Sequence, residues 1–370
     1  MIFNILKLYL PPFAIAAIIS GGLTYSVKIL AEKFGFLDRL SPRKIHPKPI
    51  PRLGGVAIVV TFILLVIAYN LITPRLAFSP FQVFLFDKRL LGVLLGALVL
   101  LIVGVLDDIR NIAPWKKLFW HLVAACLVVA FGLGITYIRL PGGEHLNLDN
   151  FIIPVSFLGK YHFQFVVWGD LLSIFWIVLL INTLNFLDGL DGLAGGISII
   201  AATAIFFLSL SLNQPAAALL AIIFAGAVSG FLPWNFNPAK IFMGDSGSMF
   251  LGYMLGVLSI ISGGKMATAF LVLGVPVLDV GWVVLRRLFK GKSPFEADKL
   301  HLHHRFLTAG LTQRQAVILL YLISIVFGIV AVSVGTREKI QAVWWLLGLM
   351  GALVIALIIL EWKKRRTRNE

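Results

Sequence analysis

Leu90 to Asp108 reads LLGVLLGALVLLIVGVLDD, an apolar run that ends in two adjacent carboxylates. A helical run of about 20 apolar residues spans the hydrocarbon core of a bilayer, which is about 30 Å thick. The charges stand where such a helix would leave the apolar layer, because an ionised side chain at mid-membrane costs about 2.5 to 3.5 kcal/mol on insertion scales. The stretch therefore predicts a transmembrane helix with an acidic pair at one membrane surface.

Comparable apolar runs recur along the whole chain. Hydrophobic residues make up 59% and charged residues 13% of the sequence, whereas a soluble domain has roughly 25% charged residues. We therefore predict one all-α membrane domain over residues 1–370, a polytopic bundle of about eleven transmembrane helices. The expected spans are 10 to 30, 54 to 73, 90 to 106, 118 to 136, 169 to 184, 193 to 211, 216 to 232, 247 to 262, 267 to 285, 315 to 334 and 341 to 361.

The basic residues indicate the orientation of the bundle. With the N-terminus outside, about 22 of the 32 Lys and Arg residues fall in cytoplasmic loops and the C-terminal tail, and about 9 fall outside. The net charge of +15 is thus explained by membrane lipids, because the basic residues flank spans, and nucleic acid is not expected as a partner. A lone cysteine, Cys126, excludes an internal disulfide.

The acidic residues and histidines gather on one predicted side. Each cluster adjoins a span end that the orientation places in the cytoplasm, although the spans were chosen for hydrophobicity alone. This coincidence predicts a single polar site at a cytoplasmic cleft. The residues are Asp107 and Asp108 after the third span, Asp188 and Asp191 after the fifth, Asp245 before the eighth, and His301, His303 and His304 after the ninth.

Two of these clusters suit a magnesium diphosphate. Adjacent carboxylates such as Asp107 and Asp108 are typical Mg²⁺ ligands, and their mutual repulsion favours a proton acceptor. In the segment NTLNFLDGLDG, Asn182, Asn185 and Asp188 recur every three residues and share a helix flank, and the glycines that follow allow a phosphate to approach the backbone. The alternative for both clusters is a set of caps at helix ends.

Three further stretches offer polar or basic side chains. Lys116 and Lys117 could hold a lipid phosphate or anchor a span in headgroups. The run from Pro233 to Ser248 offers Phe and Asn side chains to a base and Asp245 to a metal, or serves as an interfacial anchor. The histidine loop is suited to phosphate or is a basic loop without chemistry; a zinc site is disfavoured, because the spacing is unlike a helical i, i+4 pair and no cysteine takes part.

Together the motifs resemble the polyprenyl-phosphate N-acetylhexosamine-1-phosphate transferases, glycosyltransferase family 4, which has MraY-like and WecA/TagO-like branches. The resemblance covers about Phe36 to Phe306, and residues 307–370 would add two C-terminal spans and a basic cytoplasmic tail. The stretches that carry it are HPKPIPRLGG from His46, GVLDD from Gly104, NTLNFLDGLDGLA from Asn182, NFNPAKIFMGDSGS from Asn235 and SPFEADKLHLHH from Ser293.

The resemblance implies a role for each matching residue. It implies a helical bundle with a cytoplasmic active-site cleft, Mg²⁺ as cofactor with Mn²⁺ as a substitute, and a homodimer as one oligomeric state. The implied catalytic residues are Asp107, Asp108, Asp188 and His303, and the implied metal ligand is Asp245, with Asp108 as a second candidate. The implied substrate-binding residues are His46, Arg52, Lys117, Asn182, Asn185, Gly189, Leu190, Asp191, Asn235, Phe242, His301, His304 and Arg305.

The histidine loop indicates the branch. It reads HLHH with Arg305 where the peptidoglycan branch has a third histidine, so the sequence is similar to the WecA/TagO branch. The expected reaction transfers N-acetylglucosamine-1-phosphate from UDP-N-acetylglucosamine to undecaprenyl phosphate, with Asp107 as the base; a two-step route through an aspartyl intermediate is the alternative. The alternative donor is the muramyl pentapeptide nucleotide.

Two other classes of membrane protein fit the sequence less well. A membrane prenyltransferase also binds magnesium diphosphate, but it needs a second motif of the DxxxD type, and the chain has none. A secondary transporter needs ionisable groups near mid-membrane, and only Asp279 lies well inside a predicted span.

Overall fold

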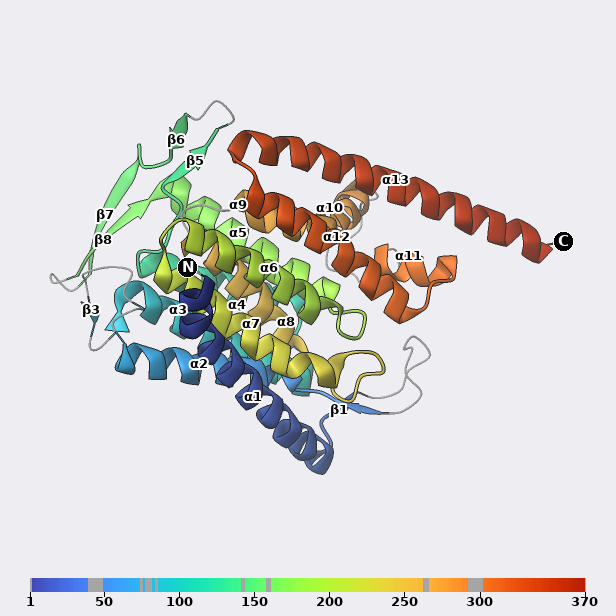
Figure 1. The fold of residues 1–370 in the computed structure, drawn as a ribbon, viewed down its shortest axis with the longest axis horizontal. Helices are drawn as coiled ribbons and strands as arrows, with labels where there is room; N and C mark the ends of the chain where they lie inside the picture. Colours follow the sequence, from blue (N-terminus) through green and yellow to red (C-terminus); the bar gives the residue numbers. More distant parts are fainter. Residues whose placement is uncertain are drawn as a thin grey trace.

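The computed structural model describes residues 2–38, 49–73, 76, 82–83, 86–140, 144–157, 161–261, 266–289, 291 and 302–369. The described chain is mostly helical, and short hairpins lie between some of the helices (Figure 1). The helices are α1 (Ile2–Phe34), α2 (Gly54–Ile72), α3 (Lys88–Arg110), α4 (Pro114–Ala130), α5 (Val167–Leu187), α6 (Leu193–Ser211), α7 (Pro215–Asn235), α8 (Asp245–Ile261), α9 (Met266–Val272), α10 (Gly274–Phe289), α11 (Leu302–Ala309), α12 (Gln313–Ser333) and α13 (Thr336–Asn369).

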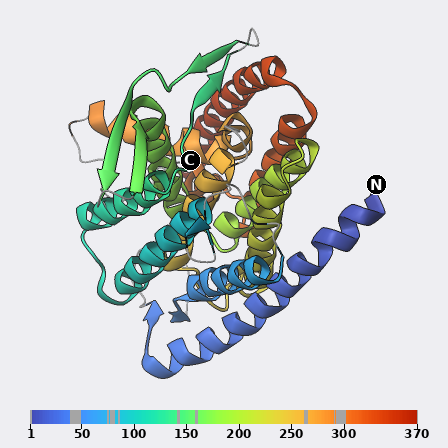
Figure 2. The ribbon, with the colours of Figure 1, turned by 90° about the vertical axis from the view of Figure 1, so that its left-hand side faces the viewer.

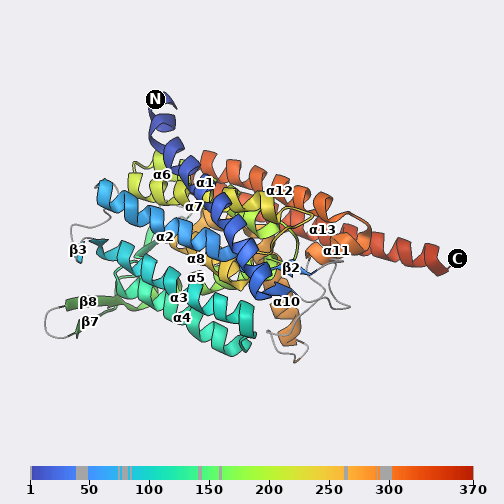
Figure 3. The same cartoon turned by 90° about the horizontal axis from the view of Figure 1, so that it is seen from below.

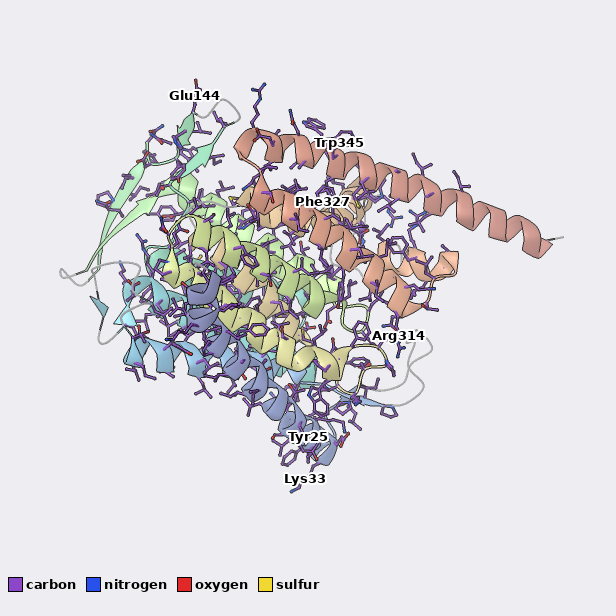
Figure 4. All side chains as sticks on the ribbon, viewed as in Figure 1. Tyr25, Lys33, Glu144, Arg314, Phe327 and Trp345 are labelled. Carbon is purple, nitrogen blue, oxygen red and sulfur yellow. The ribbon has the colours of Figure 1, made fainter. Side chains whose placement is uncertain are left out.

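The long helices form one bundle, and its two ends differ. Hairpins β5–β6 (Tyr137–Arg139, His145–Asn147) and β7–β8 (Ile152–Phe157, Tyr161–Val166) lie at one end, and α11 and the far part of α13 lie at the other (Figure 1). Glu144 and Arg314 mark these two ends in Figure 4. The ends of α3, α5 and α7 and the starts of α4, α6 and α8 therefore share the end marked by Arg314.

Helix α8 is the centre of the bundle, because every residue from Ser246 to Ile260 is buried. It lies against α5 and α3 through glycines that leave no room for a side chain. A Cβ at Gly252 would lie 2.2 Å from the Leu180 carbonyl oxygen, and one at Gly104 would lie 2.3 Å from the Ser246 Cα. Small residues permit such close helix contact inside a membrane.

Helix α1 lies on the outside of the bundle, where it crosses α7 (Figures 2 and 3). The contact again depends on glycine. A Cβ at Gly230 would lie 2.1 Å from the Ala17 carbonyl oxygen, and one at Gly226 would lie 2.4 Å from that of Phe13. The first predicted span is thus an integral part of the packed bundle.

Each predicted span overlaps described helix, although the span 118 to 136 runs past the end of α4 at Ala130. The described helices do not confirm the number eleven. Eight helices are long and apolar enough to cross a membrane, and a bent pair brings the number to nine. Helices α4 and α8 have only 17 residues each. The described chain is therefore a multi-pass membrane protein, and the higher number and the orientation stay predictions.

One predicted span is wrong as a single helix. Residues 267 to 285 form α9 and α10, which meet at an angle of 83°. The break follows Leu273, just before Gly274 and Pro276. Proline lacks the backbone N–H that a continuous helix needs and is tolerated in a first turn, so the chain starts a new helix here.

The hairpins are a further feature that the all-α prediction did not include. Strands β7 and β8 pair in antiparallel register from Ile152–Val166 to Phe157–Tyr161. Near the other end, β1 (Leu37–Asp38) pairs with β2 (Ile50–Pro51). At the hairpin end, the small pair β3 (Gln82–Val83) and β4 (Phe86–Asp87) precedes α3 (Figure 1). Each pair closes a connection between helices and leaves the helical bundle unchanged.

Candidate active site

Asp108 joins the end of α3 to the start of α8. Its Oδ1 accepts a hydrogen bond from the Asp245 backbone N at 2.8 Å, and its Oδ2 accepts from the Ser246 N at 3.2 Å and the Ser246 Oγ at 2.9 Å. A carboxylate at a helix N-terminus satisfies free N–H groups and the helix dipole. Asp108 therefore fixes the position of Asp245.

Glycines make this contact fit. Gly244 has φ +73°, in the left-handed region, and a Cβ there would lie 2.5 Å from the Asp108 Oδ2. On the other side of α8, a Cβ at Gly55 would lie 2.1 Å from the Gly247 backbone N. The loop before α8 can thus bring its backbone against both α2 and α3.

Lys117 connects the two carboxylates beside this joint. Its Nζ lies 2.8 Å from the Asp245 Oδ2 and 3.2 Å from the Asp107 Oδ2, so one ammonium pairs with two acidic residues from different helices. The Ile112 backbone N also donates to the Asp107 Oδ1, at 2.6 Å. The three charged groups form the acid-lysine cluster, which consists of Asp107, Lys117 and Asp245.

Helix α5 adds polar side chains to the same end of the bundle. The Asn185 Nδ2 donates to the Ser248 Oγ at 2.9 Å, which ties α5 to α8. Asn182 donates instead to the Val178 carbonyl of its own helix, at 2.8 Å. Both amides lie on α5 as predicted, but Asn185 contacts the neighbouring helix α8, whereas Asn182 bonds to its own helix.

Asp188 follows the last residue of α5 and lies in a strongly negative environment. Burial raises its pKa well above the ordinary value for aspartate, and the nearby carboxylates of Asp245, Asp108 and Asp191 raise it further, whereas Arg52 lowers it. Burial and the three neighbouring carboxylates therefore both disfavour the ionised form of Asp188.

The residues expected to hold uridine lie in the loops beside this cluster. Asp191 Oδ2 accepts from the Asn237 Nδ2 at 2.9 Å and the Ala239 N at 3.1 Å. Asn235 is 2% exposed; its amide accepts from the Gly192 N and donates to the Ile241 carbonyl. Their polar atoms thus hold the loops together, which is a structural role that the sequence left unassigned.

The other three uridine candidates differ in exposure. Leu190 is buried, Phe242 is half-buried and Gly189 is exposed. The Phe242 backbone binds the loop before α2, because its N donates to the Pro51 carbonyl and its carbonyl accepts from the Gly54 N. Gly189 and Phe242 are therefore more exposed than Leu190 and better placed to contact a ligand.

The first loop and the histidine loop are described only in part. Arg52 pairs with Asp38 and acts electrostatically on Asp188. His303, His304 and Arg305 belong to α11, where Arg305 is half-buried. The side chains of His303 and His304, and all of His46 and His301, lie outside the described residues, so their roles stay predictions.

Three further polar residues at the site were missed. Ser246 and Ser248 contact Asp108 and Asn185, and their place in the stretch MGDSGS was a usable signal. His121 is 3% exposed and lies one helical turn after Lys117, a spacing that puts both side chains on one face of α4. Nothing in the apolar context of His121 distinguished it from a packing residue.

The donor set fits a magnesium ion bound together with a diphosphate. No group of three His, Cys, Asp or Glu residues in the described part of the chain could hold a metal ion by itself. Mg²⁺, however, is usually held by one or two carboxylates plus substrate phosphates. Asp107 and Asp245 already share one cation, the Lys117 ammonium, so their carboxylates have the charge and proximity that such a site requires.

A multi-pass helical bundle with acidic residues of several helices gathered at one end is the class of protein that these observations define. Residues 90–263 match the family described as glycosyl transferase family 4. A probable undecaprenyl-phosphate N-acetylglucosaminyl 1-phosphate transferase of Bacillus subtilis is 33% identical over 345 residues, 91% of this chain and 87% of the relative. The chain belongs to this family.

Two further relatives support the assignment. A decaprenyl-phosphate N-acetylglucosaminephosphotransferase of Mycolicibacterium smegmatis is 32% identical over 334 residues, 83% of this chain and 77% of the relative. An undecaprenyl-phosphate alpha-N-acetylglucosaminyl 1-phosphate transferase of Thermotoga maritima is 32% identical over 319 residues, 86% of this chain and 88% of the relative. The resemblance stated from the motifs is thereby confirmed.

Proposed function

We propose that this protein transfers N-acetylglucosamine-1-phosphate from UDP-N-acetylglucosamine to a polyprenyl phosphate, undecaprenyl phosphate in the first instance, and releases UMP. The product is a lipid-linked diphosphate sugar that starts synthesis of a cell-envelope polysaccharide. The observation that carries the proposal is the acid-lysine cluster, because it joins two carboxylates and one ammonium at one end of the bundle. The names of the relatives supply the sugar and the lipid.

The chemistry requires one bond to form and one to break. An oxygen of the lipid phosphate attacks the sugar-linked phosphorus, and the bond from that phosphorus to the bridging oxygen of UMP breaks. When bound, Mg²⁺ neutralises charge on the diphosphate and the leaving UMP. One phosphoanhydride replaces another, so positioning and charge neutralisation account for the rate.

Each residue of the cluster has a distinct role in this proposal. Asp245 binds Mg²⁺, and Asp107 accepts the proton of the lipid phosphate. The Lys117 ammonium, which pairs with Asp107 and Asp245 in the structure, turns to a phosphate oxygen of the bound substrate. Asp108 acts as a positioning residue, because both of its oxygens are occupied by the N-terminus of α8.

The remaining predicted residues bind the substrates. Asn185 and Asp188 face the diphosphate, and Gly189, Asp191 and Phe242 surround the uridine. Buried Leu190 and Asn235 hold the shape of that region. The set is completed by Asn182, Arg52, His46, His301, His303, His304 and Arg305.

We also propose that the site faces the cytoplasm of a prokaryotic cell, where UDP-sugars occur. The N-terminus would then lie outside and the C-terminus inside. The distribution of Lys and Arg supports this orientation. The long α13 of the structure ends beyond the bundle at the same end as the site (Figure 1).

The proposal is tested with purified protein, undecaprenyl phosphate and Mg²⁺, scoring UMP release. UDP-N-acetylglucosamine should be turned over, and UDP-MurNAc-pentapeptide should give little or no product, because Arg305 stands where the peptidoglycan branch has its third histidine. Comparable rates with both donors would remove the branch assignment. Absence of UMP with either donor would remove the proposed reaction.

A further inference from the structure

His121 is a buried polar side chain that the proposed chemistry leaves unused. It is 3% exposed, and neither its Nδ1 nor its Nε2 has a hydrogen-bond partner among the described residues. A buried polar group without a partner costs about 1 to 3 kcal/mol. Such a group at a functional site calls for an explanation beyond packing.

The position of His121 connects it to the acid-lysine cluster. It follows Lys117 by one turn of α4, where side chains at i and i+4 are neighbours. Its ring also interacts electrostatically with both Lys117 and Asp245. A neutral imidazole has one nitrogen that accepts a hydrogen bond, and an ammonium has three protons to donate.

In the structure, the Lys117 ammonium pairs with the Asp245 carboxylate, which is the proposed ligand of the metal. Its Nζ lies 2.8 Å from the Asp245 Oδ2. A dication bound to that carboxylate would repel the ammonium, and the two cations therefore compete for Asp245. The Asp107 Oδ2 stays within reach of Lys117, at 3.2 Å, but Asp107 is the proposed proton acceptor. Lys117 therefore needs a further acceptor if it is to turn from both carboxylates towards the reacting phosphates.

We propose that His121 is a positioning residue that accepts a hydrogen bond from Lys117 and holds the ammonium beside the reacting phosphates when Asp245 binds a divalent cation. The inference rests on the proposed function. It adds an exchange of hydrogen-bond partners, in which Lys117 moves from Asp245 of α8 to His121 of its own helix α4. Lys117 pairs with both carboxylates before the metal binds and with a substrate phosphate afterwards. By accepting a hydrogen bond, His121 stabilises the Lys117 ammonium in its position beside the phosphates.

The exchange can be measured without turnover, by Mn²⁺ binding. Mn²⁺ is titrated into the purified full chain in detergent, and free Mn²⁺ is followed by electron paramagnetic resonance. Lys117→Met should tighten binding, because a competing cation is removed. His121→Leu should weaken binding about tenfold, because Lys117 then stays on Asp245, a change that matches the loss of a hydrogen bond to a charged group.

The decisive comparison is the double variant. In the Lys117→Met background, His121→Leu should leave the Mn²⁺ affinity unchanged, since no ammonium has to be relocated. His121→Gln, which keeps an acceptor oxygen, should bind Mn²⁺ like the native protein and controls for loss of packing. Gel filtration of each variant confirms that it is folded.

Three results would overturn the inference. Equal weakening by His121→Leu in both backgrounds would make His121 a packing residue or a metal ligand. No weakening in either background would make it irrelevant to the exchange. No Mn²⁺ binding by either the native protein or Lys117→Met would remove the proposed metal site itself, an outcome that the UMP assay separates from failure of the transferase reaction.

Discussion

The two ends of the bundle both contain buried aspartate, but they use it differently. At the hairpin end, Asp170 is 5% exposed and its Oδ2 accepts from the Val166 backbone N at 2.8 Å, four residues away. At the other end, Asp108 reaches backbone N–H groups 137 and 138 residues along the chain, and Lys117 joins Asp107 to Asp245. The local hydrogen bond of Asp170 stabilises the start of α5, whereas the long-range hydrogen bonds and ion pairs at the other end bring residues of three helices together.

The two ends also differ in how many acidic side chains lie close together. A cavity of about 250 Å³ lies at the hairpin end, and among the described residues that line it Asp170 is the one acidic and Arg89 the one basic side chain. At the site end, Asp107, Asp108 and Asp188 each interact electrostatically with Asp245. Concentrated negative charge is costly to fold, and it is retained where a metal or a proton is handled. Single substitutions at the two ends should therefore differ sharply.

The largest effect is expected from Asp245→Asn. The amide keeps the size of the side chain and removes the charge that Mg²⁺ prefers. UMP release should fall about a thousandfold, because a bound metal contributes several kcal/mol to the transition state. The Mg²⁺ concentration needed for half-maximal rate should rise, and a native Mg²⁺ profile would contradict the ligand assignment.

Asp107→Asn should slow the reaction by about a hundredfold or more through loss of a general base. In contrast to Asp245→Asn, its Mg²⁺ requirement should stay nearly normal, since the metal ligand is intact. Rates at saturating substrates over a range of Mg²⁺ concentrations test this difference. Near-native turnover at neutral pH would exclude Asp107 as the base.

Asp108→Asn should have an intermediate effect, about tenfold on rate, comparable to the loss of an outer-shell partner. The amide still offers one acceptor, but its NH₂ group faces donors at the start of α8, so Asp245 shifts. The matched variant Ser246→Ala, which removes one of the three hydrogen bonds, should cost less. A larger loss than that of Asp107→Asn would indicate direct chemistry by Asp108.

Asp188→Asn should change stability with pH. Because the pKa of Asp188 is raised in the folded state, folding is favoured below that pKa and this stability is lost as the pH rises through it. The neutral amide avoids the penalty, so the variant should melt a few degrees higher than the native protein at pH 8. The difference should vanish near pH 4, and melting curves without Mg²⁺ at both values check the sign.

The smallest effect on activity is expected from Asp170→Asn, the counterpart at the hairpin end. The amide oxygen can still accept from the Val166 N, and no residue of the site contacts Asp170 in the described structure. UMP release should stay within about twofold of native, in line with a substitution remote from a functional site. A loss like that of Asp108→Asn would show that the two ends are coupled.

The apolar helices and the gathering of the acidic residues at one end of the bundle could be predicted from the sequence. Length and hydrophobicity are local properties, and the cost of a charge in the membrane confines Asp107, Asp188 and Asp245 to span ends. Alternation of spans then puts these residues on one side. The break between α9 and α10 also had a local signal, the residues Gly274 and Pro276. The sequence prediction missed it because the apolar run continues across these two residues.

The partners of each side chain were decided only by the tertiary structure. Asp107 and Asp108 are neighbours in sequence, yet one pairs with Lys117 and the other caps α8. That division depends on how closely α3 approaches α8, which the glycine at 104 permits through its missing side chain. Hydrophobicity determined where the apolar helices lie along the chain, and close packing between distant helices decided which of the two carboxylates caps α8 and which pairs with Lys117.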